Sequence, residues 1–366
     1  IKDGKTVNVA LNHDINPLGS QKFSIAESLC GENVFVELTY KRNGKICGNE
    51  QHVVKRTLPV ISQKHGGEIK VTENVKFYIF DCDNVKYYFS KHTATFEKIE
   101  KDGKNYLSDK NSLFYNPYAA VNSFVPNIYR YKMDNDMYMN GKWREHGFDM
   151  MWNRVLSYNV EKVGCDYKIT VDSLFSPPKR SKEFTNKLVY TIFANGDLGV
   201  DCTLTRENDN LPYLPRYGFL LNPNENLFDK VEWEGYGPNE NYSDYKEAAK
   251  VGVYSKDIKD MFYEYVSPQE NGERCGISYL SLFGKNGAKL SVYAKGDFFS
   301  FKVNDFIGKD LLKARHITDL KRGETLELAI DGYFSGVGSN SCGPELPEDK
   351  RVTDKVLQFG VYFRFE

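Results

Sequence analysis

The chain has 366 residues, which is enough for about two domains and for a sizeable buried core. Its 49 Lys and Arg nearly balance its 50 Asp and Glu, so nucleic acid and anionic membrane surfaces are poor partners for it. It contains no run of about 18 apolar residues, and this argues against a segment that spans a membrane.

Apolar and polar residues alternate along the first sixty residues, the period that predicts β-strands. Residues 7–11 show this pattern, and residues 34–40 repeat it just before an Arg-Asn-Gly-Lys turn at 42–45. These residues supply about four strands, whereas a free-standing β-sandwich domain needs about seven. We therefore expect residues 1–62 to be the later part of a β-sandwich whose first strands belong to a longer chain.

A break in the pattern follows near residues 57–70, where Pro59, Gly66 and Gly67 interrupt the strand-like segments. Beyond it, residues 68–366 supply about fifteen or more candidate strands, enough for a large two-sheet sandwich. The sequence thus predicts an all-β fold with two domains, the later part of a small β-sandwich at 1–62 and a large antiparallel two-sheet sandwich at 68–366.

Turn residues between alternating arms predict two hairpins in the second domain. One spans residues 187–206 around Asn195-Gly196-Asp197, and the other spans 289–303 around Lys295-Gly296-Asp297. The last strand, at 357–366, places Phe359, Val361, Phe363 and Phe365 on one face. Helix signals are limited to residues 142–155, interrupted at Gly147, and to one turn at 243–250 with Ser243 as its cap.

The cysteines are seven in number, widely scattered and without a C-x-x-C pair. This spacing argues against a zinc site and against a disulfide framework. We therefore expect free thiols, most of them buried.

The segment GVGSNSCGPELP (336–347) is a glycine-rich loop that follows a strong strand. A phosphate-binding P-loop is excluded, because no Lys-Ser or Lys-Thr and no helix follow the glycines. A nucleophilic cysteine would need a basic partner, and nothing in the sequence brings His316, the nearest histidine, beside Cys342. A simple exit from a strand is the plainer interpretation, although rigidly mounted loops of this kind also enter binding sites.

Two further segments carry polar or aromatic clusters. In IYRYKMDNDMYMNGKW (128–143), the run Asp134-Asn135-Asp136 lacks the glycine and distal glutamate of a calcium-binding loop, so we expect these side chains to fix a loop, with Arg130 paired to one carboxylate. In VEWEGYGPNENYSDY (231–245), Trp233 and Tyr236 are candidate carbohydrate contacts, although loop aromatics more often pack onto a sheet.

A retaining glycosidase needs two carboxyl groups about 5 Å apart, and no such pair stands out in the sequence. A sugar mutarotase or epimerase would need a histidine facing a carboxylate, for which His92, His146 and His316 are the available candidates. A carbohydrate-binding module using the aromatic segment is the other alternative.

Six segments together resemble the C-terminal region of the glycoside hydrolase family 2 β-galactosidases, the part called the β-galactosidase small chain. They are RYKMDND, LPRYGFLL (214–221), VEWEGYGPNENYSD (231–244), YVSPQENGERCG (265–276), ARHITDL (314–320) and IDGYFSGVGSNSCGPELP (330–347). The resemblance runs from about residue 70 to the end. It implies a supersandwich related in fold to galactose mutarotase, preceded by the end of an immunoglobulin-like domain.

The resemblance also implies a function for the parent protein, which would be a retaining enzyme that hydrolyses terminal β-D-galactosyl residues. Its catalytic glutamates would lie on a barrel upstream of this chain, so we expect no catalytic residue here and no activity of this portion alone. Its partners would be the missing barrel and upstream domains, with a homo-oligomeric parent allowed. The Mg²⁺ and monovalent cation that the family often uses would bind elsewhere, which leaves no metal and no cofactor in this portion.

In the family, the loop that matches 336–347 approaches the active site, and one branch carries a tryptophan where this chain has Cys342. A thiol cannot stack on a sugar as an indole does. We therefore carry over only a place in the substrate-pocket wall, for Ser341, Cys342 and Gly343. The usual aromatic-Arg-Ala-Pro run before Asp-Asn-Asp is kept here only in part. The matching residues, interpreted as structural, are Arg130, Asp134, Asn135 and Asp136.

Overall fold

The computed structural model describes residues 10, 16–22, 31–61, 67–82, 84–110, 123–180, 182–284 and 286–366. The chain divides into two compact units, the N-terminal unit at Ile1–Thr57 and the main unit at Leu58–Glu366. Within the described ranges, no helix is both long enough and apolar enough to cross a membrane.

The N-terminal unit contains a two-stranded antiparallel sheet of β1 (Val34–Arg42) and β2 (Lys45–Lys55). The turn between them uses Asn43 and Gly44, both at positive φ, as an Asn-Gly hairpin requires. This confirms the turn predicted at 42–45. Apart from residue 10, the strand predicted at 7–11 lies outside the described residues. The immunoglobulin-like assignment of this unit stays a prediction.

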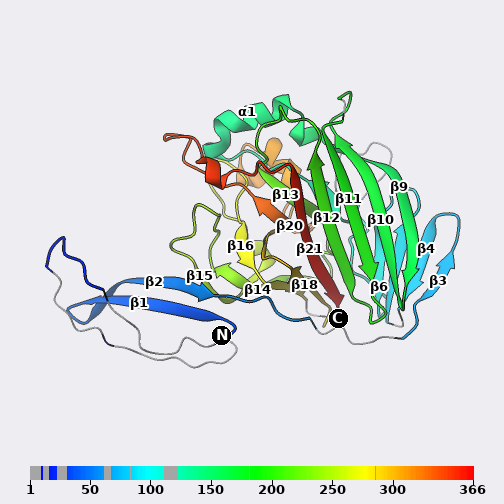
Figure 1. The fold of residues 1–366 in the computed structure, drawn as a ribbon, viewed down its shortest axis with the longest axis horizontal. Helices are drawn as coiled ribbons and strands as arrows, with labels where there is room; N and C mark the ends of the chain where they lie inside the picture. The colour runs from blue at the N-terminus through cyan, green and yellow to red at the C-terminus, as the bar shows by residue number, and fades with distance from the viewer. Residues whose placement is uncertain are drawn as a thin grey trace. The chain divides into compact units, whose positions relative to one another are not determined.

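In the described residues, the main unit is built from three antiparallel sheets (Figure 1), and this confirms the all-β prediction. In spatial order, the nine-stranded sheet contains β15 (Lys250–Asp257), β14 (Lys230–Gly237), β17 (Tyr279–Phe283), β18 (Lys289–Lys295), β21 (Val356–Phe365), β12 (Leu198–Arg206), β11 (Phe184–Ile192), β10 (Asp166–Ser176) and β9 (Trp152–Val163).

The other two sheets have five strands each. One contains β16 (Arg274–Ile277), β19 (Phe299–Asn304), β20 (Glu327–Phe334), β13 (Arg216–Leu221) and β8 (Val125–Asn127). The other contains β3 (Lys70–Glu73), β4 (Phe77–Asp81), β5 (Val85–Ser90), β6 (Phe96–Lys101) and β7 (Lys104–Asn105).

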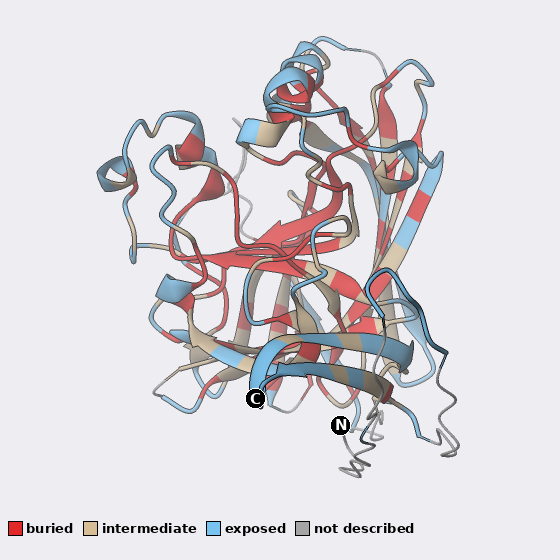
Figure 2. Cartoon of the chain, turned by 90° about the vertical axis from the view of Figure 1, so that its left-hand side faces the viewer, coloured by how far each residue is buried: buried red, intermediate tan, exposed pale blue. Residues whose placement is uncertain are grey.

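Both five-stranded sheets pack against the same face of the nine-stranded sheet. Phe363 and Phe365 of β21 are two residues apart and so point to one face. The Phe363 ring lies 6.2 Å from Phe219 of β13, and the Phe365 ring lies 5.9 Å from Tyr87 of β5. Most of the buried apolar side chains of the three sheets therefore form one continuous hydrophobic core. Buried residues are coloured red in Figure 2.

Helical structure is short. The helix α1 spans Met137–Glu145, and the 3-10 turns are η1 (Asp134–Asp136), η2 (Phe148–Met150), η3 (Ile258–Asp260), η4 (Gly308–Leu312), η5 (Ile317–Asp319) and η6 (Glu348–Lys350). The helix predicted at 142–155 is thus displaced, because Gly147 at φ +74° ends α1 and Trp152 already belongs to β9, which pairs with β10.

The helical turn predicted at 243–250 is absent. Tyr242 and Tyr245 pair with each other across a tight turn, a second turn follows at Lys246–Ala249, and β15 begins at Lys250. The Ser243 hydroxyl has no hydrogen-bond partner, so it caps no helix. Hydrogen bonds from the backbone of Val337 and Gly338 to Asp244 hold this segment in a turn.

Of the two predicted hairpins, one is correct. Strands β11 and β12 pair from Ile192↔Leu198 outward around Gly196 at φ +84°. The hairpin predicted at 289–303 is wrong, because β18 pairs with β17 and β21, whereas β19 pairs with β16 and β20 in the opposing sheet. The turn at Gly296 therefore carries the chain from one sheet to the other.

The cysteines depart from expectation in burial. Cys82 and Cys202 are buried and Cys275 is half-buried, but Cys47, Cys165 and Cys342 are exposed. The prediction of mostly buried thiols is therefore wrong for half of the six described cysteines. Cys165 lies in the turn between β9 and β10 and Cys342 lies in a loop, where no sheet covers them.

Candidate functional site

The 336–347 loop leaves the end of β20 with a buried base and an exposed tip. Ser335 is fully buried, and its hydroxyl donates to the Leu214 carbonyl at 2.6 Å. The chain becomes buried again at Leu346. Between these points, the side chains of Ser341 and Cys342 are exposed, as is Gly343. The three residues predicted to line a pocket wall thus form the tip of a protruding loop.

Arg130 fixes the base of this loop through hydrogen bonds to its backbone. Its guanidinium donates to the carbonyls of Ser335 at 2.9 Å and Gly336 at 3.0 Å. The same guanidinium makes a two-bond ion pair with Asp136, at 2.6 Å for each bond. Arg130 therefore pairs with one carboxylate of the Asp-Asn-Asp run, as the sequence predicted, and it also fixes backbone more than 200 residues away.

Two more side chains grip the loop just above its base. The Asp244 carboxylate accepts hydrogen bonds from the backbone N–H groups of Val337 at 2.9 Å and Gly338 at 2.8 Å. The Asn135 amide donates to the Gly338 carbonyl at 2.7 Å and accepts from the Ser341 hydroxyl at 2.8 Å. The two other segments that carry polar or aromatic clusters, 128–143 and 231–245, therefore both contact this loop.

Aromatic rings complete the base of the loop. Phe334, the last residue of β20, lies 5.7 Å from the ring of the buried Tyr242. The Arg130 guanidinium lies 5.3 Å and the Arg216 guanidinium 5.0 Å from the centre of the Phe334 ring. Arginine stacked on an aromatic ring keeps its charge while it packs against apolar surface. Phe334 thus joins the loop to a second cluster behind it.

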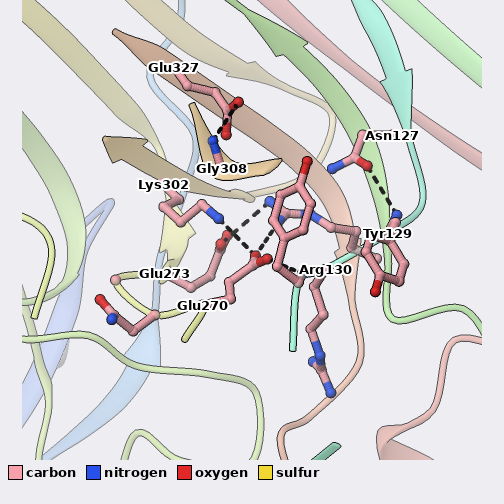
Figure 3. Close-up of polar contacts among 12 residues, drawn as sticks. Asn127, Tyr129, Arg130, Glu270, Glu273, Lys302, Gly308 and Glu327 are labelled. Atoms are coloured by element: carbon pink, nitrogen blue, oxygen red, sulfur yellow. Dashed lines mark hydrogen bonds and ion pairs between the residues drawn. The ribbon is translucent and has the colours of Figure 1, made fainter. Parts of the chain in front are cut away.

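That second cluster is a buried network of charges around Arg216, and Figure 3 labels its members Glu270, Glu273 and Lys302. Arg216 donates to Glu270 at 2.6 Å and forms a two-bond ion pair with Asp331, while Lys302 donates to Glu270 at 2.8 Å. Glu273 lies 3.5 Å from Arg216, yet neither of its carboxylate oxygens has a hydrogen-bond partner. Figure 3 shows Glu270, Glu273 and Lys302 converging, with Arg130 directed away from them.

The surroundings of the two glutamates in this network shift their pKa values in opposite directions. Burial raises the pKa of Glu270, but Lys302 and Arg216 oppose it and the net pKa lies below the ordinary value. Burial raises the pKa of Glu273 to about 8 against the attraction of Arg216. Both side chains are at most 3% exposed, so neither carboxyl group can reach a substrate outside the protein.

The other predicted site residues are Asp134, Tyr236 and Trp233. Asp134 is exposed, and its backbone N–H donates to the Gln269 side chain at 3.1 Å. Tyr236 is half-buried on β14, with the Lys246 ammonium 5.1 Å from its ring. Trp233 is fully buried, packed against Tyr254 and Phe301. A ring with no exposed face cannot stack on a sugar, so the carbohydrate contact predicted for Trp233 is corrected to core packing.

The three candidate histidines lie in different elements. His92 follows β5 and is exposed, His146 ends α1, and His316 precedes η5, where its backbone N–H donates to Asp319 at 2.9 Å. Among the described residues, no group of three or more His, Cys, Asp or Glu side chains has the arrangement of a metal site.

Sequence reasoning did not single out Asp244, Arg216, Glu270 or Asp331. All four lie inside the segments quoted for the family resemblance, at NYSD, LPRYG, PQENG and IDG. Their spacing carried no local signal, because each acts on a partner in another segment. The segments themselves were therefore the only available pointer to these residues.

Comparison with known proteins agrees with this picture. The family model described as "Beta galactosidase small chain" matches residues 81–363. The β-galactosidase of Actinobacillus pleuropneumoniae is 31% identical over 274 residues, which cover 74% of this chain and 25% of that protein. The β-galactosidase of Kluyveromyces lactis is 29% identical over 304 residues, which cover 81% of this chain and 28% of that protein.

Among solved structures, a galactose 1-epimerase from Lactobacillus acidophilus aligns with 91% of this chain and 99% of its own at 12% identity, with a TM-score of 0.43. That score is too low to establish a shared fold, so the relation to galactose mutarotase stays a prediction. The chain spans about a quarter to a third of the length of the curated relatives that it matches. Because the family model covers most of its residues, this chain belongs to the β-galactosidase small chain family.

Proposed function

We propose that this chain is the non-catalytic C-terminal portion of a retaining β-galactosidase that hydrolyses terminal β-D-galactosyl residues. Joined to a catalytic portion, it acts as scaffold, and the tip of the 336–347 loop forms part of the substrate-pocket wall. Family membership supports the first half of this proposal. The observation that carries the second half is an exposed Ser341-Cys342-Gly343 tip on a base held by Arg130, Asn135 and Asp244.

The placement of the acids supports a catalytic centre elsewhere in the parent protein. A retaining glycosidase needs two carboxyl groups about 5 Å apart that both reach the sugar. In the described part of this chain, the network around Arg216 brings three acids together, Glu270, Glu273 and Asp331. These side chains are at most 3% exposed and face Arg216 and Lys302. They serve packing and charge balance rather than glycoside chemistry.

The tip of the loop offers small polar contacts rather than a stacking platform. Ser341 presents a hydroxyl group, and the Cys342 thiol lies 3.9 Å from it. Hydroxyl groups bond sugar hydroxyls, whereas a thiol adds only a weak contact. We therefore expect a looser hold on the second sugar of a disaccharide than an indole at residue 342 would give.

Cys342 itself provides the test, because alkylation measures its accessibility. In the whole enzyme, saturating galactose should slow the reaction of Cys342 with iodoacetamide several-fold, since a bound sugar covers the pocket wall. Cys165, exposed in the β9–β10 turn, and Cys47, exposed on β2, are internal controls whose rates should not change. Equal rates at Cys342 with and without galactose would contradict the place of this loop in the pocket.

A further inference from the structure

Asp244 lies on the tight turn that Tyr242 and Tyr245 form by exchanging two backbone hydrogen bonds of 3.0 Å each. The turn is firmly mounted, because the buried Tyr242 ring packs against Phe334 and its hydroxyl donates to Glu240 at 3.1 Å. Glu240 in turn accepts from the Gly272 backbone at 2.8 Å. The Asp244 carboxylate is therefore presented from a fixed support.

The loop is shaped to receive this carboxylate. Val337 and Gly338 point consecutive N–H groups at its two oxygens, 2.9 and 2.8 Å away. A Cβ atom on Gly336 would lie 2.5 Å from the carboxyl carbon of Asp244, so only glycine leaves room for the side chain there. Gly338 has φ +66°, a conformation that glycine adopts without strain.

Asn135 completes the grip from a separate segment. Its amide donates to the Gly338 carbonyl, so both backbone groups of Gly338 are bonded to side chains, those of Asn135 and Asp244. We call these two side chains the clamp. Its oxygen accepts from the Ser341 hydroxyl and so reaches the tip directly. Beyond this contact, the tip is closed on itself by Gly343 and Cys342, whose N–H groups donate to the Ser339 carbonyl at 2.7 and 3.1 Å.

A glycine-rich loop without such anchors would sample many conformations, because glycine restricts the backbone least. Hydrogen bonds from backbone N–H groups to a carboxylate are stronger than those between neutral groups. We infer that Asp244 is a positioning residue that, together with Asn135, sets where the Ser341–Cys342 tip stands in the substrate pocket. Its effect on substrates rests on the proposed function, whereas the clamp itself does not.

Hydrogen exchange of the purified chain tests the clamp directly. In Asp244→Ala, the Val337 and Gly338 amides should exchange about tenfold faster or more, because each loses its acceptor. Asn135→Ala, which leaves that carboxylate in place, should speed exchange in residues 339–343. Asp209→Ala is the matched control, since this exposed carboxylate lies outside the loop and pairs with Lys355 at 3.4 Å. Unchanged exchange of the 337–343 amides in both clamp variants would overturn the inference.

Kinetics of the whole enzyme test the positioning. Asp244→Ala should raise KM for a disaccharide substrate several-fold and change kcat for a nitrophenyl galactoside by less than about twofold, because the catalytic groups are untouched. Asp244→Asn, which keeps one acceptor oxygen, should restore part of the loss. Faster exchange with unchanged KM for the disaccharide would overturn the positioning role, whereas failed protection of Cys342 by galactose would instead refute the proposed function.

Discussion

Glu270 and Glu273 are three residues apart in one buried network, yet their surroundings favour opposite charge states. Glu270 receives hydrogen bonds from Arg216, Lys302 and the Tyr131 backbone, and these partners favour its ionised form. Glu273 has no hydrogen-bond partner on either oxygen, so burial favours its neutral form. Pairs of this kind often mark an acid and a base in an active site. Here both carboxyl groups are buried away from solvent, so they cannot act as the acid and base of an active site.

The raised pKa of Glu273 predicts how stability depends on pH. Burial raises this pKa from 4.5 to about 8. A raised carboxyl pKa contributes stability that is fully present below the unfolded value and is lost as pH rises through the folded value. Between pH 5 and 8, the wild type should therefore lose up to about 1.4 kcal/mol of unfolding free energy per pH unit relative to Glu273→Gln, which stays neutral.

Urea denaturation at pH 5, 7 and 9 measures this difference. The Glu273→Gln variant should show the flatter profile, with a difference of a few kcal/mol accumulated by pH 9. Glu348→Gln, an exposed glutamate in η6, is the matched control and should follow the wild type. If the Glu273→Gln and wild-type profiles ran parallel, the neutral state of Glu273 in the fold would be disproved.

At the scale of elements, two glycines give opposite predictions. Gly141 lies in α1 with open space where a Cβ atom would stand, so Gly141→Ala should stabilise the protein by about 0.5–1 kcal/mol through helix propensity. Gly218 lies at the register shift between β13 and β20, where a Cβ atom would overlap the Ile330 carbonyl oxygen. Gly218→Ala should destabilise by about 3 kcal/mol or more, because backbone cannot move aside.

Thermal unfolding of the two variants beside the wild type decides both signs in one experiment. We expect a higher midpoint for Gly141→Ala and a markedly lower one for Gly218→Ala. A neutral Gly218→Ala would mean that the close approach of β13 to β20 is not as the structure has it.

The same scale shows what the sequence could and could not predict. Strands such as β11, β12 and β21 were recognisable because one face is buried and the alternation follows from that. The partner strands of β19 could not be recognised from the sequence. A Lys-Gly-Asp turn has the same composition whether it closes a hairpin or carries the chain to the opposing sheet. The composition of segment 243–250 favours a helix, whereas contacts of Asp244 with residues 93 and 94 positions away favour the turn.

The candidate site, too, could be predicted from the sequence only in part. The segments that form it were predicted from motifs, and the ion pair of Arg130 with a nearby carboxylate followed from local spacing. Trp233 was misassigned because composition does not reveal that β14 is covered by Phe301 of the opposing sheet. The clamp of Asn135 and Asp244, together with the Arg130 contacts at the loop base, depends on three distant segments that only the fold brings together.

At the scale of the whole molecule, the main unit is a continuous core of three sheets that carries one clamped loop on its surface. Its buried ion pairs link Arg216 of β13 to Asp331 of β20 and, through Glu270, to Lys302 of β19, behind the base of that loop. On our account, this arrangement serves an active site whose reacting carboxyl groups are supplied by the rest of a β-galactosidase.

Hydrolysis of nitrophenyl β-D-galactoside by the purified chain tests this account most directly. The chain should be made in a host that lacks β-galactosidase of its own, and the whole enzyme should be measured beside it. We predict no turnover above buffer for the chain alone and clear turnover for the whole enzyme. Turnover by the chain alone that is abolished by Cys342→Ala or by Glu270→Gln would contradict the account.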